Sequence, residues 1–213
     1  MPMFKRLLPL FWAVLTVGVV GGVVWYGLKQ LGGLNTTLNT NNAPPPATGP
    51  KMLRTGQDYY VLVKLIEFNT REPDGSDWDR GGGSAPDAKV LMTWHGQQVF
   101  ALPQRTDELI STWDLFRVNI KDIALSGGNV DIASAINAPI VRVEPGEKLT
   151  VEVYDSDLMQ DDLALRVKLQ LDELHEGENN IPPPRGSGVR RLVVQALSRE
   201  TSLSDLIALA SKR

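Results

Sequence analysis

The segment KLTVEVYDSDLMQDDLALRVKLQL, residues 148–171, decides the fold. Apolar and polar residues alternate on both sides of its acidic centre, in KLTVEVYD (148–155) and in LALRVKLQL (163–171). A period of two is typical of a β-strand with one buried face. The segment therefore predicts two strands joined by a loop rich in carboxylates, namely Asp155, Asp157, Asp161 and Asp162. Such close carboxylates repel one another unless a positive group lies among them.

Further runs of aromatic and β-branched residues predict more strands, at 59–68, 88–94, 97–102, 115–120 and 140–144. His95-Gly96, between two of these runs, is typical of a tight hairpin turn. About seven short strands without a convincing helix between them indicate an all-β fold. We expect an antiparallel β-sandwich over residues 57–180, with DIASAIN (131–137) as a candidate short helix.

The composition limits the function. The 213-residue chain has room for one domain with a real core, since 42% of its residues are hydrophobic. It contains no cysteine, which excludes disulfides, thiolate catalysis and zinc–cysteine sites. Residues 51–180 hold 23 of the 25 acidic residues. Nucleic acid is therefore not an expected partner, because phosphates need a basic surface, whereas metal cations suit this charge.

Residues 7–28 contain no charged side chain and are long enough to span a membrane as a helix. Lys5 and Arg6 precede this stretch, so the positive-inside rule places residues 1–6 in the cytoplasm. The rest of the chain is then extracytoplasmic, and periplasmic in a Gram-negative-type envelope. We expect an uncleaved signal-anchor; a cleaved signal peptide is the alternative.

Residues 29–56 are predicted to be a flexible linker, because residues 30–50 are polar and end in a proline-rich run. At the other end, residues 181–213 predict a proline-rich turn followed by an amphipathic C-terminal helix, since apolar residues recur there at helical spacing. This helix either packs on the sandwich, or binds partners or a second copy, or lies on anionic lipid through Arg190, Arg191 and Arg199. Oligomerisation through the membrane helix is a further possibility.

The order of several motifs resembles that of C2 domains, β-sandwich modules of which many bind Ca²⁺ and phospholipid. Residues 145–157, PGEKLTVEVYDSD, resemble the strand that leads into the third binding loop of the family, with Asp162 as a later acidic residue. Pro86-Asp87-Ala88-Lys89-Val90 resembles the motif that opens the second strand. TDELISTW (106–113) resembles the stretch where these domains often carry a Thr and then a Trp. The likeness covers residues 57–175.

The resemblance implies a Ca²⁺ site whose ligands are Asp79, Asp87, Asp155, Asp157 and Asp162. Ca²⁺ takes about six to eight oxygen ligands, which two acidic loops at one edge of a sandwich can supply. The ion would remove the repulsion between the carboxylates and let the same loops approach anionic headgroups. Zinc and copper prefer imidazole or sulfur ligands, and the chain has two histidines and no cysteine.

Other interpretations stay open. Acidic residues in turns are often simply solvated, so the loops need hold no ion. Trp78 either covers the edge of the sandwich or inserts into a bilayer or stacks on a partner. Paired carboxylates also serve glycosidases, and a serine nucleophile would need His95 or His175 as its base. Both histidines are expected at the surface, and we expect no enzymatic activity.

The sequence thus predicts a membrane-anchored C2-like domain that binds Ca²⁺ and thereby engages lipid or protein. The alternative is a metal-independent structural or assembly protein of the cell envelope. In that case the sandwich and the C-terminal helix bind protein partners.

Overall fold

The structure is a computed structural model, and it describes residues 49–78, 85–125, 131–157 and 161–211. The chain divides into two compact units, Met1–Thr48 and Gly49–Arg213. The first unit, which includes the predicted membrane helix at 7–28, lies outside the described residues. Within the described ranges no helix is long and apolar enough to cross a membrane.

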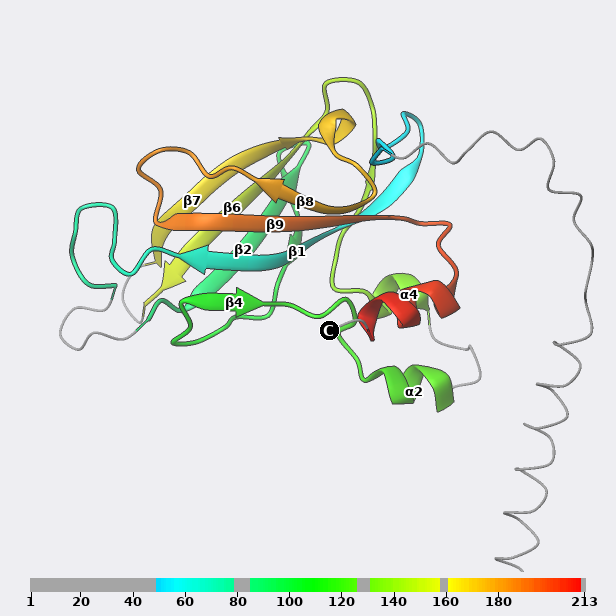
Figure 1. Ribbon diagram of the computed structural model, residues 1–213, viewed down its shortest axis with the longest axis horizontal. Helices are drawn as coiled ribbons and strands as arrows, with labels where there is room; N and C mark the ends of the chain where they lie inside the picture. Colours follow the sequence, from blue (N-terminus) through cyan, green and yellow to red (C-terminus); the bar gives the residue numbers. More distant parts are fainter. Residues whose placement is uncertain (1–48, 79–84, 126–130, 158–160, 212–213) are drawn as a thin grey trace, which may run out of the picture. The chain divides into compact units, whose positions relative to one another are not determined.

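The second unit is a sandwich of two antiparallel sheets, as the alternating sequence predicts (Figure 1). The first sheet runs in the order β4 (Ile110–Thr112), β1 (Asp58–Phe68), β9 (Val189–Ser198) and β8 (Gly177–Ile181), with β5 (Ile140–Arg142) also paired to β1. The second sheet runs in the order β3 (Gln97–Ala101), β2 (Ala88–Trp94), β6 (Lys148–Ser156) and β7 (Asp161–Gln170).

The core lies between the sheets and follows from the alternation in the sequence. Leu149, Val151 and Val153 on β6 are fully buried, whereas the residues between them are partly exposed. Burying one such aliphatic side chain contributes about 1.5–3 kcal/mol. His95 and Gly96 both have positive φ, 52° and 75°, as a two-residue type I′ hairpin between β2 and β3 requires. The predicted hairpin is thus confirmed.

The predicted C-terminal helix is wrong over most of its length. Val189–Ser198 is not helical but forms β9, which pairs with β1 on one side and β8 on the other. Both faces of this strand are buried from Leu192 to Leu197, so its apolar residues run almost continuously and lack the alternation of a half-buried strand. Its β-branched valines favour the strand. The basic residues proposed to lie on lipid along a helix therefore belong to a sheet or follow it.

Only Leu203–Ala210 is helical in this region, as α4. The side chain of Ser202 caps it by accepting a hydrogen bond from the backbone N–H of Asp205 over 3.2 Å. Leu206 is fully buried against the core, so the apolar face of α4 is used inside the domain. These contacts agree with the prediction that the C-terminal helix packs on the sandwich.

Other boundaries also differ from the prediction. Residues 115–120 are not a strand; the pairing with β1 is made by β4, and α2 (Ile120–Leu125) begins where the predicted strand would end. The short helix at 131–137 is confirmed as α3 (Ile132–Ala135), capped by Asp131. A 3₁₀ turn, η1 (Leu171–Glu173), follows β7.

The end of the predicted linker belongs to the folded domain. Leu53 is buried, and its backbone N–H donates to the carbonyl of Leu174 over 2.9 Å. Met52 forms an isolated β-bridge with His175. Residues 51–56 are therefore part of the sandwich rather than of the flexible linker predicted over 29–56.

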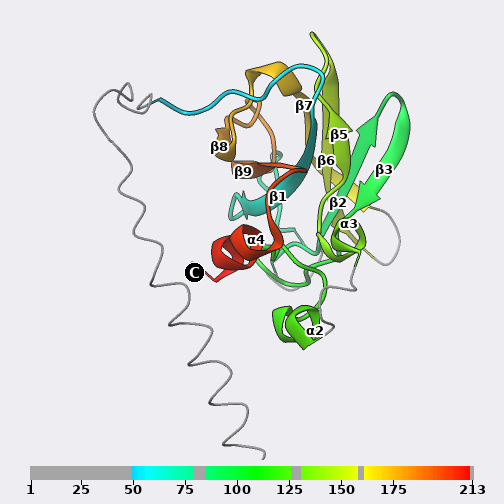
Figure 2. The same cartoon turned by 90° about the vertical axis from the view of Figure 1, so that its right-hand side faces the viewer.

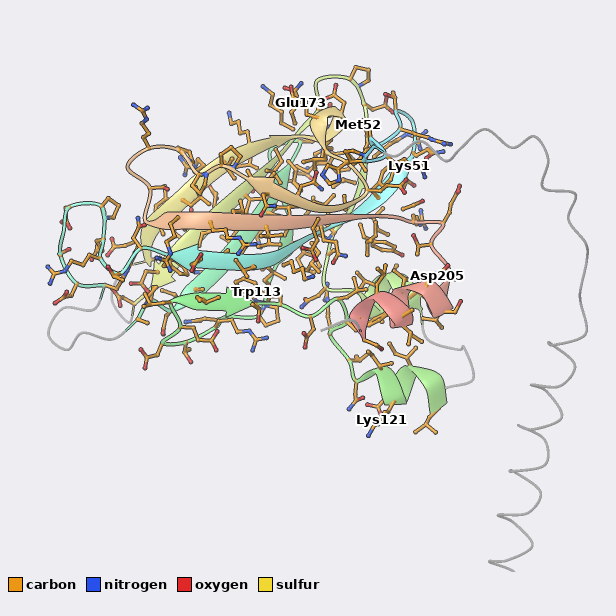
Figure 3. The ribbon with its side chains drawn as sticks, in the orientation of Figure 1. Lys51, Met52, Trp113, Lys121, Glu173 and Asp205 are labelled. Atoms are coloured by element: carbon orange, nitrogen blue, oxygen red, sulfur yellow. The ribbon has the colours of Figure 1, made fainter. Side chains whose placement is uncertain are left out.

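The sandwich has two distinct ends. At the helix end, β1 begins, β9 ends, and α2, α3 and α4 gather, as Figure 2 shows in a view onto this end. Asp205, Lys121 and Lys51 lie toward it in Figure 3. At the opposite loop end, β1 ends and β2 and β7 begin. β1 has 11 residues and separates the two ends by roughly 35 Å.

Candidate functional site

Strand pairing brings most of the predicted aspartates together at the loop end. Ala88 pairs with Asp155 across β2 and β6, and Asp155 pairs with Asp162 across β6 and β7. Asp87, Asp155 and Asp162 therefore lie at the ends of three neighbouring strands. The described end of the first acidic loop, at Asp87, thus lies beside the second acidic loop, as the sequence predicts. Asp157 follows β6 by one residue, and Asp79 lies outside the described residues.

We call this cluster the rim; its members are Asp87, Asp107, Asp155, Asp157, Asp161 and Asp162. Asp155 is its most buried member, with 1% of its surface exposed. Its Oδ1 accepts a hydrogen bond from the backbone N–H of Asp87 over 2.6 Å. In return, the N–H of Ser156 donates to the carbonyl of Asp87 over 2.9 Å. A buried carboxylate needs such donors, and here the neighbouring strand provides one.

The carboxylate of Asp87 is also engaged by the protein. Its Oδ1 accepts from the backbone N–H of Asp107 over 2.8 Å, and its Oδ2 accepts from the side-chain amide of Gln104 over 3.4 Å. Asp107 has a φ of 57°, a left-handed conformation that Asp tolerates better than most residues. Its own carboxylate accepts from the N–H of Ala85 over 2.8 Å. The segment after β3 is thereby held against the start of β2.

Asp161 has a positive partner. The ammonium of Lys89 on β2 donates to Oδ2 of Asp161 over 2.5 Å, and the hydroxyl of Ser156 donates to Oδ1 over 2.8 Å. These two donors, Lys89 first, lower the pKa of Asp161 from its ordinary value of 3.8. The cation that the clustered carboxylates require is therefore supplied, at least in part, by a side chain.

Several of the described rim carboxylates already have protein partners, which bears on a bound Ca²⁺. Among the residues that the structure describes, no group of three or more Asp, Glu or His side chains is arranged to hold a metal ion. Asp87 and Asp155 already use carboxylate oxygens to accept N–H groups, and Asp161 is paired with Lys89. A calcium ion needs about six to eight oxygens and would have to compete with these donors. The described part of the rim thus holds no preformed site for the ion, and the role of Asp79 stays a prediction.

Sequence reasoning missed two members of this arrangement. Lys89 is part of the motif Pro86–Val90. Its contact with Asp161 on β7 depends on the strand order β2-β6-β7, which the sequence does not reveal. Asp107 is far from the acidic loops in sequence, and only the fold of the segment after β3 places its N–H at Asp87. Neither residue carries a local sequence signal for its partner.

Trp78 closes the loop end from the side. It is 3% exposed, meets Phe68 edge-on with ring centroids 5.4 Å apart, and donates from Nε1 to the carbonyl of Asn69 over 2.8 Å. Its ring lies over Gly188, where an added Cβ would be 2.3 Å from Cη2. Of the two roles predicted for Trp78, the structure confirms that its side chain covers the edge of the sandwich.

The two histidines lie away from the rim. His95 sits in the β2–β3 turn, 3.3 Å from a carboxylate oxygen of Glu147. The ring of His175 contacts the carbonyl of Glu176, and its backbone N–H donates to the side chain of Asn179. Both residues stabilise turns toward the helix end.

No protein-family model matches the sequence, and no curated protein does. Two solved structures show some likeness in fold. One is described as the structure of a C2 domain, with 11% identity and a TM-score of 0.40, covering 66% of this chain and 97% of that one. The other is human GIVD cytosolic phospholipase A2 in complex with an inhibitor and terbium chloride, with 16% identity and a TM-score of 0.43.

The likeness to the phospholipase covers 68% of this chain but 18% of the enzyme. Identities and TM-scores this low carry no argument about function. What the fold and the rim define directly is a class: an all-β sandwich with an acidic end that is tied together by the protein's own donors.

Proposed function

We propose that the chain is a non-catalytic, C2-like binding module that engages a protein partner through its loop end without requiring a metal. The observation that carries this proposal is the engagement of the rim carboxylates by protein donors. Asp155 accepts from the N–H of Asp87, and Asp161 is paired with Lys89. A rim satisfied in this way can hold its shape without a bound ion.

The loop end also exposes apolar side chains beside its acidic ones. Ile110 on β4 is 52% exposed, Leu109 before it 37%, and Leu163 on β7 45%. Leu109 accepts a hydrogen bond from the N–H of Phe68, the last residue of β1, and Leu163 pairs with Tyr154 near the end of β6. We infer that these apolar groups contribute to the contact with the partner, since the core of a protein–protein interface is largely apolar.

The rim and the point where residues 1–48 join the domain lie at opposite ends of β1. The described residues begin at Gly49, and the segment 51–56 packs at the helix end, whereas the rim lies at the far end of β1. We keep the anchor and the extracytoplasmic location of the sandwich as parts of this proposal.

Site-specific photocrosslinking tests the proposal. A photoreactive amino acid is introduced into the full chain at Ile110 or at Leu163, with Val99 on β3, which is 36% exposed, as the control. We expect adducts with one discrete protein from Ile110 and Leu163, equally in Ca²⁺ and in EGTA, and none from Val99. Equal adducts at all three positions, or none at Ile110 and Leu163, would refute partner binding at the loop end.

Calcium-dependent binding of lipid or protein is the second candidate. It is favoured by the convergence of Asp87, Asp155 and Asp162 on neighbouring strands. These residues, with Asp157 and Asp79, would hold the ion, and the ion would supply the positive charge that attracts an anionic surface. Sedimentation with vesicles containing phosphatidylserine distinguishes the two. If the fraction of full chain that sediments with the vesicles rises with Ca²⁺, and this rise is lost in the double variant Asp157→Asn with Asp162→Asn, the calcium-dependent function is supported. If that fraction does not change with Ca²⁺, the first proposal is supported.

A further inference from the structure

We propose that Lys89 is the built-in counter-cation of the rim and that its ammonium excludes Ca²⁺ from the loop end. The proposal rests on the metal-independent function argued above and explains how the rim achieves it. It follows from the disagreement between the acidic motif, which suggests a calcium site, and the contacts, which already provide a cation.

The ammonium of Lys89 crosses a strand to reach its partner. Lys89 lies on β2 and pairs with Tyr154 of β6, whereas Asp161 lies on β7 and pairs with Ser156 of β6. The side chain therefore passes over β6 and joins the two outer strands of the rim. The contact is made at 2.5 Å and is reinforced by the hydroxyl of Ser156 on the other oxygen of Asp161.

Several other basic side chains described at the loop end have partners elsewhere. Arg71 donates to the carbonyl of Gly75 and is paired with Asp77, and Arg105 donates to the carbonyl of Thr112. Arg190 is paired with Glu67 on the first sheet. Among these described contacts, Lys89 is the residue that brings a full positive charge to the rim carboxylates.

A fixed ammonium opposes calcium in two ways. It repels a dication held a few ångströms away, and it occupies an oxygen of Asp161, a carboxylate beside the predicted ligands Asp157 and Asp162. At an effective dielectric constant near 20, one unit charge at such distances changes ion affinity by roughly tenfold or more. Without the ammonium, Asp161 would lose its positive partner, and a dication would relieve its repulsion with the neighbouring Asp157 and Asp162.

The experiment is calorimetric titration of Ca²⁺ into the full chain, kept in mild detergent, and into Lys89→Met. We expect Lys89→Met to bind Ca²⁺ at least roughly tenfold more tightly than the parent chain. Lys168→Met removes a charge from an exposed residue farther along β7 and is expected to gain nothing. Lys89→Arg keeps the charge and is likewise expected to stay at the parent affinity.

The remaining outcomes separate the two proposals. If Lys89→Met binds no more tightly than the parent, or if Lys168→Met gains as much, Lys89 is not the excluding cation. Circular dichroism on the same samples confirms that the variants are folded, and Lys89→Met combined with Asp161→Asn should lose much of the gain. Tight Ca²⁺ binding by the parent chain itself would instead overturn the metal-independent function.

Discussion

The backbone N–H of Asp87 donates a 2.6 Å hydrogen bond to Oδ1 of Asp155, and so ties the start of β2 to the end of β6. Asp155 is 1% exposed, which makes this carboxylate a structural acceptor as well as a candidate ligand. The bond joins the two acidic loops that the sequence suggested would meet around a metal ion. In the structure the contact between these loops is made by the backbone N–H of Asp87 instead.

Replacing Asp155 with Ala is expected to lower the free energy of unfolding by about 1–3 kcal/mol, because it leaves the partly buried N–H of Asp87 without its acceptor. Asp155→Asn retains an oxygen acceptor and should lose less. Chemical denaturation of the full chain in EGTA measures both variants. An Asp155→Ala variant as stable as the parent in EGTA would show that the bond contributes little.

The Lys89–Asp161 pair is expected to stabilise the fold in a pH-dependent way. The pKa of Asp161 is lower in the folded chain than its ordinary value of 3.8. The stabilisation is therefore complete above that value and is lost as the pH falls through the folded pKa. Both side chains are about a third exposed, so the coupling should be only roughly 0.2–1 kcal/mol at neutral pH.

A double-mutant cycle of Lys89→Met and Asp161→Asn, read from denaturation curves between neutral pH and pH well below 3.8, measures this coupling. We expect a coupling energy that shrinks toward zero as the pH decreases. A coupling that is unchanged across this range would mean that the two residues do not interact as an ion pair.

Gly188→Ala is expected to destabilise the loop end by about 1–3 kcal/mol, because the added Cβ would press into the ring of Trp78 at 2.3 Å. Gly49→Ala is the matched control, since a Cβ there meets nothing within 4 Å. Thermal unfolding of the two variants should show a lower melting temperature for Gly188→Ala alone. Equal melting temperatures would place the Trp78 ring elsewhere.

Truncation tests whether the tail belongs to a sheet. Deletion of residues 189–213 removes β9, the strand between β1 and β8, and should abolish cooperative unfolding. Deletion of residues 203–213 removes α4 and the buried Leu206 but leaves both sheets, so the domain should fold with reduced stability. A folded domain lacking residues 189–213 would mean that this segment is an appendage.

The sequence predicts the fold well where one face of a strand is exposed. β6 and β2 alternate clearly, and their bounds fall within a residue or so of the expected ranges. β9 is not recognisable as a strand from the sequence, because a strand buried on both faces shows no alternation of apolar and polar residues. Its VRRLVVQAL run also matches helical spacing. β8, with the sequence GENNI, has too few apolar residues to be recognised before its neighbour is known.

The site was predictable in its location but not in its chemistry. The acidic loops indicated which strand ends would meet, because carboxylates cluster visibly in the sequence. What satisfies those carboxylates depends on the register, which sets the N–H of Asp87 against Asp155 and carries Lys89 across β6 to Asp161. Such partners come from residues that are distant in the sequence and ordinary in composition.

The most direct test of the central claim is the melting temperature of the full chain, in mild detergent, in excess EGTA and in millimolar Ca²⁺. If Lys89 and the backbone amide of Asp87 already satisfy the rim carboxylates, we expect the same melting temperature in both conditions. A ligand that binds the native state raises the melting temperature by mass action. A clear rise in Ca²⁺ that disappears in Asp155→Asn combined with Asp157→Asn would contradict the claim.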